Sequence, residues 1–576
     1  MKLDSKRLTE LIEVARGQRP AELCLRGGRV VNVFSGSIET VDMAVHDGLV
    51  VGWGDYTALR NIDVGGFFVA PGFIDGHLHI ESTLLSPRQF CAAVLPHGTS
   101  AVVADPHEIA NVLGLDGIRY FLAAAESLPL DLYFNLPSCV PACPLETSGA
   151  RLRAADLHAI LPHPKVLGLA EMMNFPGVIH AVPDVLDKLL LFQEHVRDGH
   201  APMLSGMDLN AYLVSGIGSD HECTTLSEAR EKLAKGMAIM IREGSQSKDL
   251  AQLLPLINQT TWPRCLLVTD DRHPDDLLRE GHMNAVVNRA MSCGLDPILA
   301  LTLATWTAAA LFRLPRHGAL APGYRADFSI SPTLNPWTPM RVFKAGMEVA
   351  RNGQLLMDPE SWPQPQAPPS PMHITRLSGG DLTVPAQPGK LKVIGVQEGT
   401  LLTRKILAEP KVDRGQVVAD LDRDLLKIVV YNRYQPDRTP AVGFVHGFGL
   451  DRGALAATVA HDSHNLIAVG TNDDAILSVV EAVRKSGGGI AIGAETGPVL
   501  LLPLPIAGLM TDWPIARVAN QLERLKKQAR AWGSRLNNPF MALSFLALAV
   551  IPELKLTDLG LVDVSTFSLV TLFDEC

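Results

Sequence analysis

The residues best suited to chemistry in this sequence are two histidines at the end of a short stretch that contains two glycines. Residues 71–79 read Pro-Gly-Phe-Ile-Asp-Gly-His-Leu-His, so one residue separates His77 from His79. Side chains alternate faces in an extended chain, and both imidazoles therefore project to one side of a strand end. Neutral imidazole is the commonest nitrogen ligand for divalent metals. The pair predicts a metal site, against the alternative of two ordinary histidines in a turn.

The longer string around the pair is more specific than a His-x-His pair alone. Residues 71–79, with the apolar run 68–70 that leads into them, resemble the first-strand signature of the amidohydrolase superfamily. The resemblance implies a metal-dependent hydrolase built on a TIM (β/α)8 barrel. It also implies that further metal ligands stand at the ends of later strands.

A barrel of this kind needs eight strand ends, and the sequence offers eight places between residues 71 and 314 where an apolar run stops at polar residues. These places are 77–79, 105–107, 135–138, 171, 200, 220–222, 242–243 and 270–271. Helical stretches are expected between most of them, for example over 184–197 and 227–235. Alternating strands and helices predict parallel βαβ units, and eight such units close a barrel. The polar residues should then converge at the carboxyl ends of the strands.

The amidohydrolase resemblance implies roles for six of these residues. The six are His77 and His79 as ligands of one metal ion, His200 and His221 as ligands of a second, Glu171 as the bridge between the ions, and Asp270 as a ligand of the first ion that also moves protons. Each has a simpler structural alternative, since Glu171 could cap a helix and His200 could be a core histidine. Imidazole and carboxylate donors suit two divalent ions, manganese or iron, with zinc as the alternative.

Two residues at the second predicted strand end, Asp105 and His107, are not at the superfamily's usual ligand positions. They could act as a second acid/base pair or orient the substrate. The competing interpretation is that Asp105-Pro106 only turns the chain. With Asp270 and Glu171 they form our set of candidate catalytic residues.

Further strings narrow the resemblance within the superfamily. They include Ala-Asp-Pro-His-Glu-Ile-Ala-Asn-Val at 104–112, Gly-Leu-Ala-Glu-Met-Met at 168–173, Ser-Asp-His-Glu at 219–222 and Thr-Asp-Asp-Arg-His at 269–273. Together they resemble the bacterial adenine deaminase family over nearly the whole chain. The resemblance implies hydrolysis of adenine to hypoxanthine and ammonia by a metal-bridged hydroxide, a step of purine salvage. The alternatives are an amidohydrolase acting on another aminopurine or a cyclic amide and, last, a metal-free scaffold protein.

The remaining sequence predicts additional domains around the barrel, which give an α/β protein with a small β domain and a C-terminal α+β domain. The expected segments are 1–70 for the first part of the small β domain, 71–315 for the metal-dependent barrel, 316–357 for the return segment of the β domain, 358–389 for a proline-rich linker, and 390–576 for the C-terminal domain.

The C-terminal domain contains a second histidine pair, His461 and His464, in the string His-Asp-Ser-His-Asn. A third metal site is one interpretation, but no further histidine or cysteine stands close by in the sequence, which favours a hydrogen-bonded turn. We expect this domain to pack against the barrel and help to close its mouth, with a subunit interface as the alternative.

Composition limits the classes of partner. The formal net charge of -10 over 576 residues is modest and argues against a nucleic-acid-binding surface. The eight cysteines are scattered, as in a reduced cytoplasmic protein. The N-terminus resembles no targeting segment, and the apolar run 542–551 is too short to span a bilayer. We therefore expect a cytoplasmic homo-oligomer that acts on a small molecule, without nucleic acid or membrane.

Overall fold

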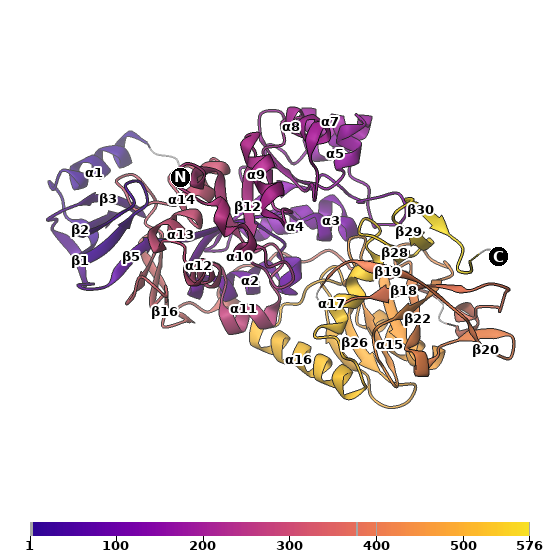
Figure 1. The fold of residues 1–576 in the computed structure, drawn as a ribbon. Helices are drawn as coiled ribbons and strands as arrows, with labels where there is room; N and C mark the ends of the chain where they lie inside the picture. The colour runs from indigo at the N-terminus through magenta and orange to yellow at the C-terminus, as the bar shows by residue number, and fades with distance from the viewer. Residues whose placement is uncertain (1–3, 376–377, 399, 575–576) are drawn as a thin grey trace.

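Eight parallel strands, in one sheet of five and one of three, form a barrel in a computed structural model, which describes residues 4–375, 378–398 and 400–574 (Figure 1). The strands are β6 Phe73–Leu78, β7 Thr99–Ala104, β8 Asp131–Leu136, β9 Val166–Met172, β10 Val196–Gly199, β11 Ser219–Asp220, β12 Ala238–Arg242 and β13 Cys265–Val268. The segment after β13 returns to β6, because Asp270 donates its backbone N–H to the carbonyl oxygen of His77 at 3.0 Å. The predicted TIM barrel is confirmed.

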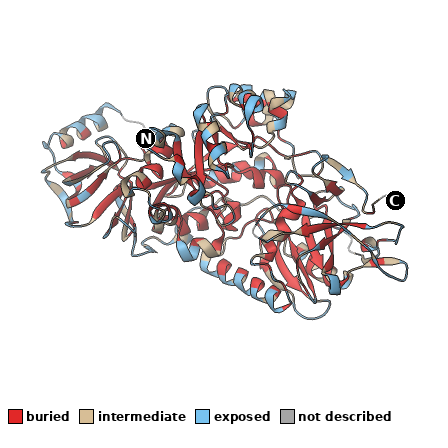
Figure 2. Ribbon diagram, viewed as in Figure 1, coloured by how far each residue is buried: buried red, intermediate tan, exposed pale blue. Residues whose placement is uncertain are grey.

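Burial explains why the barrel strands read as apolar runs. β7 and β12 are buried at every position, as expected for parallel strands covered on both faces (Figure 2). The helices around them are α2 Pro87–Val94, α3 His107–Leu113, α4 Leu115–Ala125, α5 Ala154–His158, α6 Phe175–Ile179, α7 Pro183–Leu191, α8 Gly206–Val214, α9 Leu226–Ala234, α10 Leu250–Leu253, α11 Pro274–Glu280, α12 Met283–Ser292, α13 Pro297–Leu303 and α14 Trp306–Leu311.

One helix is shorter than the sequence predicts. The expectation over 184–197 is wrong at its end, because α7 stops at Leu191 and Val196 already begins β10. Val196 and Arg197 pair with Gly168 and Leu169 of β9. Strand pairing in the barrel thus overrides the local helical pattern, which is a weak determinant compared with tertiary context.

A single small sheet unites segments on either side of the barrel. It contains β1 Ala21–Asn32, β2 Ser37–His46, β3 Leu49–Trp53, β4 Ala58–Asp63 and β5 Phe68–Pro71 before the barrel, and β14 Phe328–Ser331, β15 Arg341–Lys344, β16 Met347–Arg351 and β17 Gln354–Leu355 after it. β5 pairs antiparallel with β14, Pro71 opposite Phe328. The expectation of one β unit split by the barrel is confirmed.

The C-terminal domain combines a mainly antiparallel eight-stranded sheet with helices, as the α+β prediction requires. Its sheet strands are β18 Leu391–Val396, β19 Thr403–Ala408, β22 Leu425–Tyr431, β23 Ala441–His446, β24 Ala454–Ala457, β25 Leu466–Gly470, β26 Gly489–Gly493 and β27 Leu500–Pro503. The helix α15, Asp473–Lys485, packs on this sheet. Its N-cap Asn472 accepts the backbone N–H of Ala475, a favourable helix start.

Two smaller sheets and two further helices complete this domain. They are β20 Lys411–Asp413 with β21 Gln416–Val418, β28 Leu554–Thr557 with β29 Gly560–Asp563 and β30 Ser568–Val570, α16 Ile515–Ala531 and α17 Pro539–Ser544. The segment 358–389, predicted as a linker, contributes to the core of the C-terminal domain. Ile374 and Leu382 are buried there in one apolar cluster with Val429 and Val479. No helix among the described residues is long and apolar enough to cross a membrane.

The barrel and the C-terminal domain share a continuous interface. Helix α16 lies along α11, where Lys526 Nζ is 2.6 Å from Asp275 Oδ2 (Figure 1). Leu277 from α11 and Leu525 from α16 belong to one buried apolar cluster. The C-terminal domain therefore packs directly on the barrel.

Candidate active site

Glu171 lies at the centre of the polar side chains that meet at the carboxyl ends of the barrel strands. It is the penultimate residue of β9, and its two carboxylate oxygens face different histidines. Oε1 is 3.3 Å from Nε2 of His79, while Oε2 is 2.5 Å from Nδ1 of His200 and 3.2 Å from Nε2 of His221. The carboxylate thus stands between two sets of imidazoles, which is the arrangement a bridging ligand requires. It caps none of the barrel helices.

Asp270 stands on the other side of the first two histidines. Its Oδ1 lies 3.4 Å from Nε2 of His77 and 3.4 Å from Nε2 of His79. The neighbouring Asp271 instead accepts the hydroxyl hydrogen of Ser82. Asp270, and not Asp271, is therefore the carboxylate that faces the histidine pair.

The backbone at Asp270 is held in an uncommon conformation, with φ of +59°. Asp75, which is fully buried, accepts the backbone N–H of Thr269 at 3.2 Å and its hydroxyl hydrogen at 2.5 Å. Those contacts join β6 to the residue before Asp270. The same strand that carries His77 and His79 thus fixes the position of Asp270.

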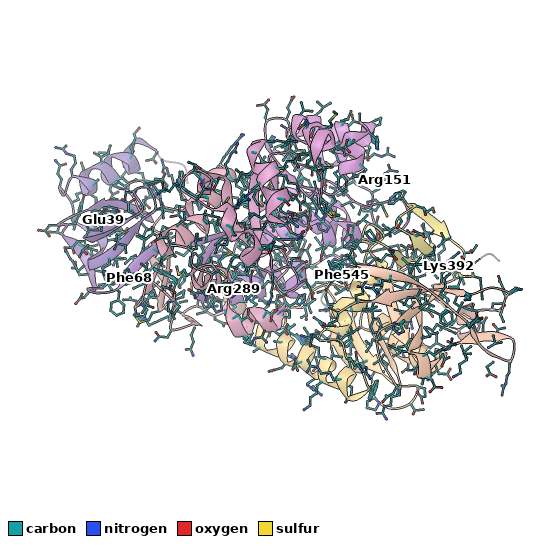
Figure 3. All side chains as sticks on the ribbon, viewed as in Figure 1. Glu39, Phe68, Arg151, Arg289, Lys392 and Phe545 are labelled. Atoms are coloured by element: carbon teal, nitrogen blue, oxygen red, sulfur yellow. The ribbon has the colours of Figure 1, made fainter. Side chains whose placement is uncertain are left out.

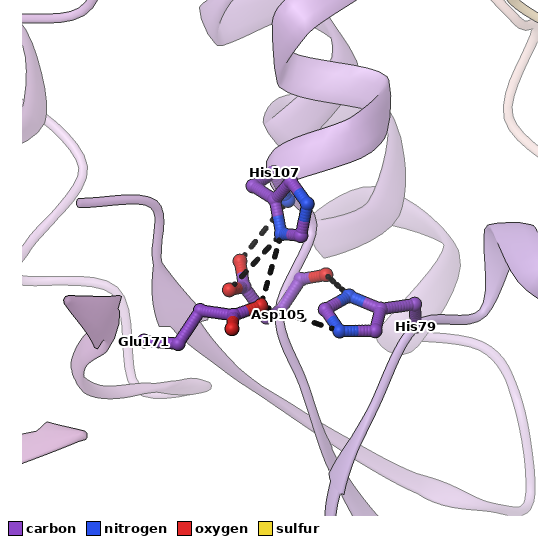
Figure 4. A group of neighbouring side chains, drawn as sticks. All are labelled: His79, Asp105, His107 and Glu171. Carbon is purple, nitrogen blue, oxygen red and sulfur yellow. Dashed lines mark hydrogen bonds and ion pairs between the residues drawn. The ribbon is translucent and has the colours of Figure 1, made fainter. Parts of the chain in front are cut away.

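Asp105 and His107 belong to the same group of side chains (Figure 4). Ligand atoms of His79, Asp105, His107 and Glu171 lie within 4.8 Å of one another. Nδ1 of His79 lies 3.2 Å from the carbonyl oxygen of Asp105, and Nδ1 of His107 lies 3.5 Å from Oε1 of Glu171. Asp105 also turns the chain, because its Oδ1 accepts the backbone N–H of His107 at 3.0 Å. The two sequence interpretations of this residue are thus compatible.

The electrostatics of this group favour positive charge at its centre. Burial alone would lower the pKa of His200, but the carboxylates of Glu222 and Glu171 raise it to about 9. Burial likewise lowers the pKa of His107, but the carboxylate of Asp105 outweighs burial and raises the pKa to about 10. Carboxylates that stabilise protonated imidazoles would also stabilise a cation in their place.

The donor set also has the free atoms that divalent ions need. Among the described residues, several buried atoms here have no hydrogen-bond partner: Nε2 of His77, Nδ1 of His107, Nδ1 of His221 and Oδ2 of Asp105. Leaving such atoms unpaired costs free energy. Nitrogen and carboxylate oxygen are the donors that manganese, iron and zinc accept. The residues present therefore fit the metals that the sequence predicts.

Two important contacts of the predicted ligands were missed by the sequence reasoning. Asp198, fully buried in β10, places Oδ2 at 3.3 Å from Nδ1 of His77. It stands two residues before His200, so the same strand alternation that paired His77 with His79 could have identified it. Arg242, which ends β12, places Nη1 at 3.1 Å from Oδ2 of Asp270. No local pattern predicts that pair, because its partners lie on different strands.

Similarity to known proteins covers the whole chain. The model of the amidohydrolase family matches residues 68–351, and the model of the adenine deaminase C-terminal domain matches residues 400–568. The chain is 68% identical over 574 residues to the adenine deaminase of Syntrophobacter fumaroxidans, covering 100% of both chains. It is 48% identical to the adenine deaminase of Dehalococcoides mccartyi and 46% identical to adenine deaminase 2 of Carboxydothermus hydrogenoformans, in each case covering 98% of this chain and 99% of the relative.

Proposed function

The chain belongs to the adenine deaminase family of amidohydrolases, and we propose on that basis that it hydrolyses adenine to hypoxanthine and ammonia. The observation that carries the proposal is Glu171, whose two oxygens face His79 on one side and His200 and His221 on the other. This arrangement suits a pair of metal ions. Relatives named adenine deaminase match the chain over 99–100% of their own length.

The proposed metal ligands divide into two groups around Glu171. His77, His79 and Asp270 would hold one divalent ion, and His200 and His221 would hold the other. We propose manganese or iron, with zinc as the alternative, because the donors are imidazole nitrogens and carboxylate oxygens. Such ions, when bound, lower the pKa of water and supply hydroxide at neutral pH.

The chain's own residues account for proton transfer and positioning. We propose that Asp270 takes the proton of the attacking water and passes it to the leaving amine, since its Oδ1 faces both imidazoles. Arg242 holds the other oxygen of Asp270 at 3.1 Å and so limits rotation of the carboxylate. We propose Asp105 and His107 as a second acid/base pair, because His107 lies beside both Asp105 and Glu171.

One experiment separates this function from the alternatives. Purified protein loaded with manganese is mixed with adenine, other aminopurines and cyclic amides. Release of ammonia is followed for the aminopurines, and ring opening is followed by ultraviolet absorbance for the cyclic amides. Adenine should be turned over with the highest kcat/KM. Preference for another aminopurine or a cyclic amide would identify a different amidohydrolase, and no turnover of any compound would favour a metal-free scaffold.

We also propose that the protein acts in the cytoplasm, as a homo-oligomer, without nucleic acid or membrane. Its formal net charge of -10 supports the lack of a nucleic-acid surface. The seven cysteines within the described residues are free thiols, as in a reducing compartment, whereas Cys576 lies outside the described residues. Light scattering coupled to size exclusion would determine the oligomeric state.

A further inference from the structure

The segment 460–465 of the C-terminal domain reaches the barrel next to the candidate active site. Nδ1 of His461 lies 3.0 Å from Oε1 of Glu108, which is buried in the first turn of α3 beside His107. Asn465 donates its side-chain N–H to the carbonyl oxygen of Thr147, on a loop of the barrel, at 2.8 Å. The segment is therefore bound to the barrel at both of its ends.

Only His461 of the two histidines in this segment lies within hydrogen-bond distance of Glu108, because Nε2 of His464 has no hydrogen-bond partner among the described residues. Nδ1 of His464 accepts the backbone N–H of Ala460 at 3.2 Å, so the neutral ring carries its proton on Nε2, 3.9 Å from Oε2 of Glu108. Burial raises the pKa of Glu108, but His461 more than offsets this and keeps the pKa well below its usual value. Potential ligand atoms of Glu108, His461 and His464 lie within 4.8 Å of one another, and the contact of His461 with Glu108 joins the two domains at this point.

Asp462, between these histidines, has an oxygen with no partner. The residue is only 4% exposed, and its Oδ2 accepts no hydrogen bond from any described residue. Burial raises the pKa of Asp462, and among nearby charges the imidazole of His107 opposes this rise most. A buried carboxyl oxygen without a donor is costly. Asp462 follows His461, which contacts Glu108 beside His107, so a ligand of the active site could satisfy this oxygen.

A cavity between the two domains leads toward the same segment. It has a volume of about 460 Å³ and is lined by residues of both domains, among them His273 and Phe545. Phe545 stacks on His461 with 4.5 Å between ring centroids and 17° between planes, and Figure 3 shows it on the side of its domain that faces the barrel. His273 follows Asp270 by three residues. One residue of the cavity lining, Phe545, thus contacts the segment 460–465, and another, His273, belongs to the loop that begins with Asp270.

We propose that the segment 460–465 completes the substrate site, with Asp462 accepting an N–H of the purine and His461 acting as a positioning residue for Glu108. An aminopurine offers two kinds of donor, its exocyclic amine and its ring N–H, and the unpartnered oxygen of Asp462 is an acceptor for either. This inference rests on the proposed function, since it assumes that the substrate is a purine.

Steady-state kinetics of the full-length, manganese-loaded protein test the proposal. Asp462→Asn should raise KM for adenine about 10- to 100-fold, the loss expected for a hydrogen bond to a charged group. His461→Gln should lower kcat/KM for adenine. Neither variant should lower the metal-to-protein ratio or the Tm of the protein.

A neighbouring carboxyl provides the matched control. Burial, and next the charge of Asp462, raise the pKa of Glu146 to about 8, so the two acids could merely form a structural pair. If so, Glu146→Gln should reproduce the effect of Asp462→Asn. In our proposal Glu146→Gln leaves KM within about twofold of wild type.

The outcomes separate this proposal from the proposed function. Wild-type protein that releases no ammonia from adenine would overturn the function itself. Wild-type protein that is active, together with an Asp462→Asn variant of unchanged KM, would overturn only the role of this segment. If Asp462→Asn is unstable, Asp462→Glu keeps the charge and shifts it by one methylene; a wild-type KM in that stable variant would also overturn the proposal.

Discussion

The substitution Asp198→Asn should weaken divalent-metal binding without unfolding the chain, because Asp198 sets the orientation of His77. The Asp198 Oδ1 atom accepts the N–H of Gly199 at 2.8 Å and the hydroxyl hydrogen of Ser219 at 2.7 Å. Its Oδ2 has no hydrogen-bond donor among the described residues, and Nδ1 of His77 lies 3.3 Å away. This contact favours a proton on Nδ1 of His77 and leaves the lone pair of Nε2 directed toward Asp270.

An asparagine at position 198 would reverse that preference. Its oxygen can still accept from Gly199 and Ser219, so its amide nitrogen would face Nδ1 of His77. Two donors oppose each other there, and His77 would move its proton to Nε2, the nitrogen that faces the metal position. Losing an outer partner of this kind lowers metal affinity about 10- to 100-fold. That range corresponds to about 1.4–2.7 kcal/mol of binding free energy.

Titration of Mn²⁺ into chelator-treated protein, followed by calorimetry, measures the effect directly. Ser219→Ala is the matched control, because it removes a donor from the other oxygen of Asp198 and leaves the contact with His77 in place. Its metal affinity should stay within a few-fold of wild type. Thermal unfolding without metal verifies that both variants fold. Asp198→Asn protein that binds Mn²⁺ with the wild-type Kd would refute the role assigned to Asp198.

Other substitutions separate metal binding from chemistry and from domain packing. His77→Ala should abolish activity and lower metal content while circular dichroism remains unchanged; an unaltered metal-to-protein ratio would contradict the ligand role. Glu171→Gln should lower metal occupancy and turnover together, whereas Asp270→Asn should retain more metal and reduce kcat about 10²- to 10⁴-fold. Near-normal turnover in Asp270→Asn would assign proton transfer to Asp105 or His107 instead. Truncation after Pro371 should yield a poorly soluble or weakly active barrel, because it uncovers the apolar side of α11; a soluble barrel with full activity would show that the C-terminal domain is dispensable.

Local patterns in the sequence predict what is set by strand geometry. His77 and His79 share one side of a strand end because side chains alternate, and each polar residue after an apolar run comes to the same rim because the strands are parallel. The end of α7 at Leu191 was not predicted, since the pairing of Val196 with β9 decides it and a helical pattern in the sequence does not record that pairing.

Contacts between distant segments account for most of what the sequence left undetermined. Glu108 and His461 are in different domains, and nothing within either segment indicates that the two side chains meet. The same holds for Arg242 and Asp270, which are brought together only when the barrel closes. Resemblance to a family supplied the ligand roles, but the partners that orient the ligands became visible only in the structure.

The pairing of β5 with β14 has a consequence for synthesis of the protein on the ribosome. Pro71 and Phe328 are neighbours in the small sheet, yet Phe328 is made about 260 residues later. At about 5–20 residues per second this interval lasts roughly 10–50 s. Throughout it, one edge of β5 has backbone N–H and C=O groups without their final partners, and such edges favour aggregation. The nascent chain should therefore depend most on chaperones after β5 has emerged and before β14 is available.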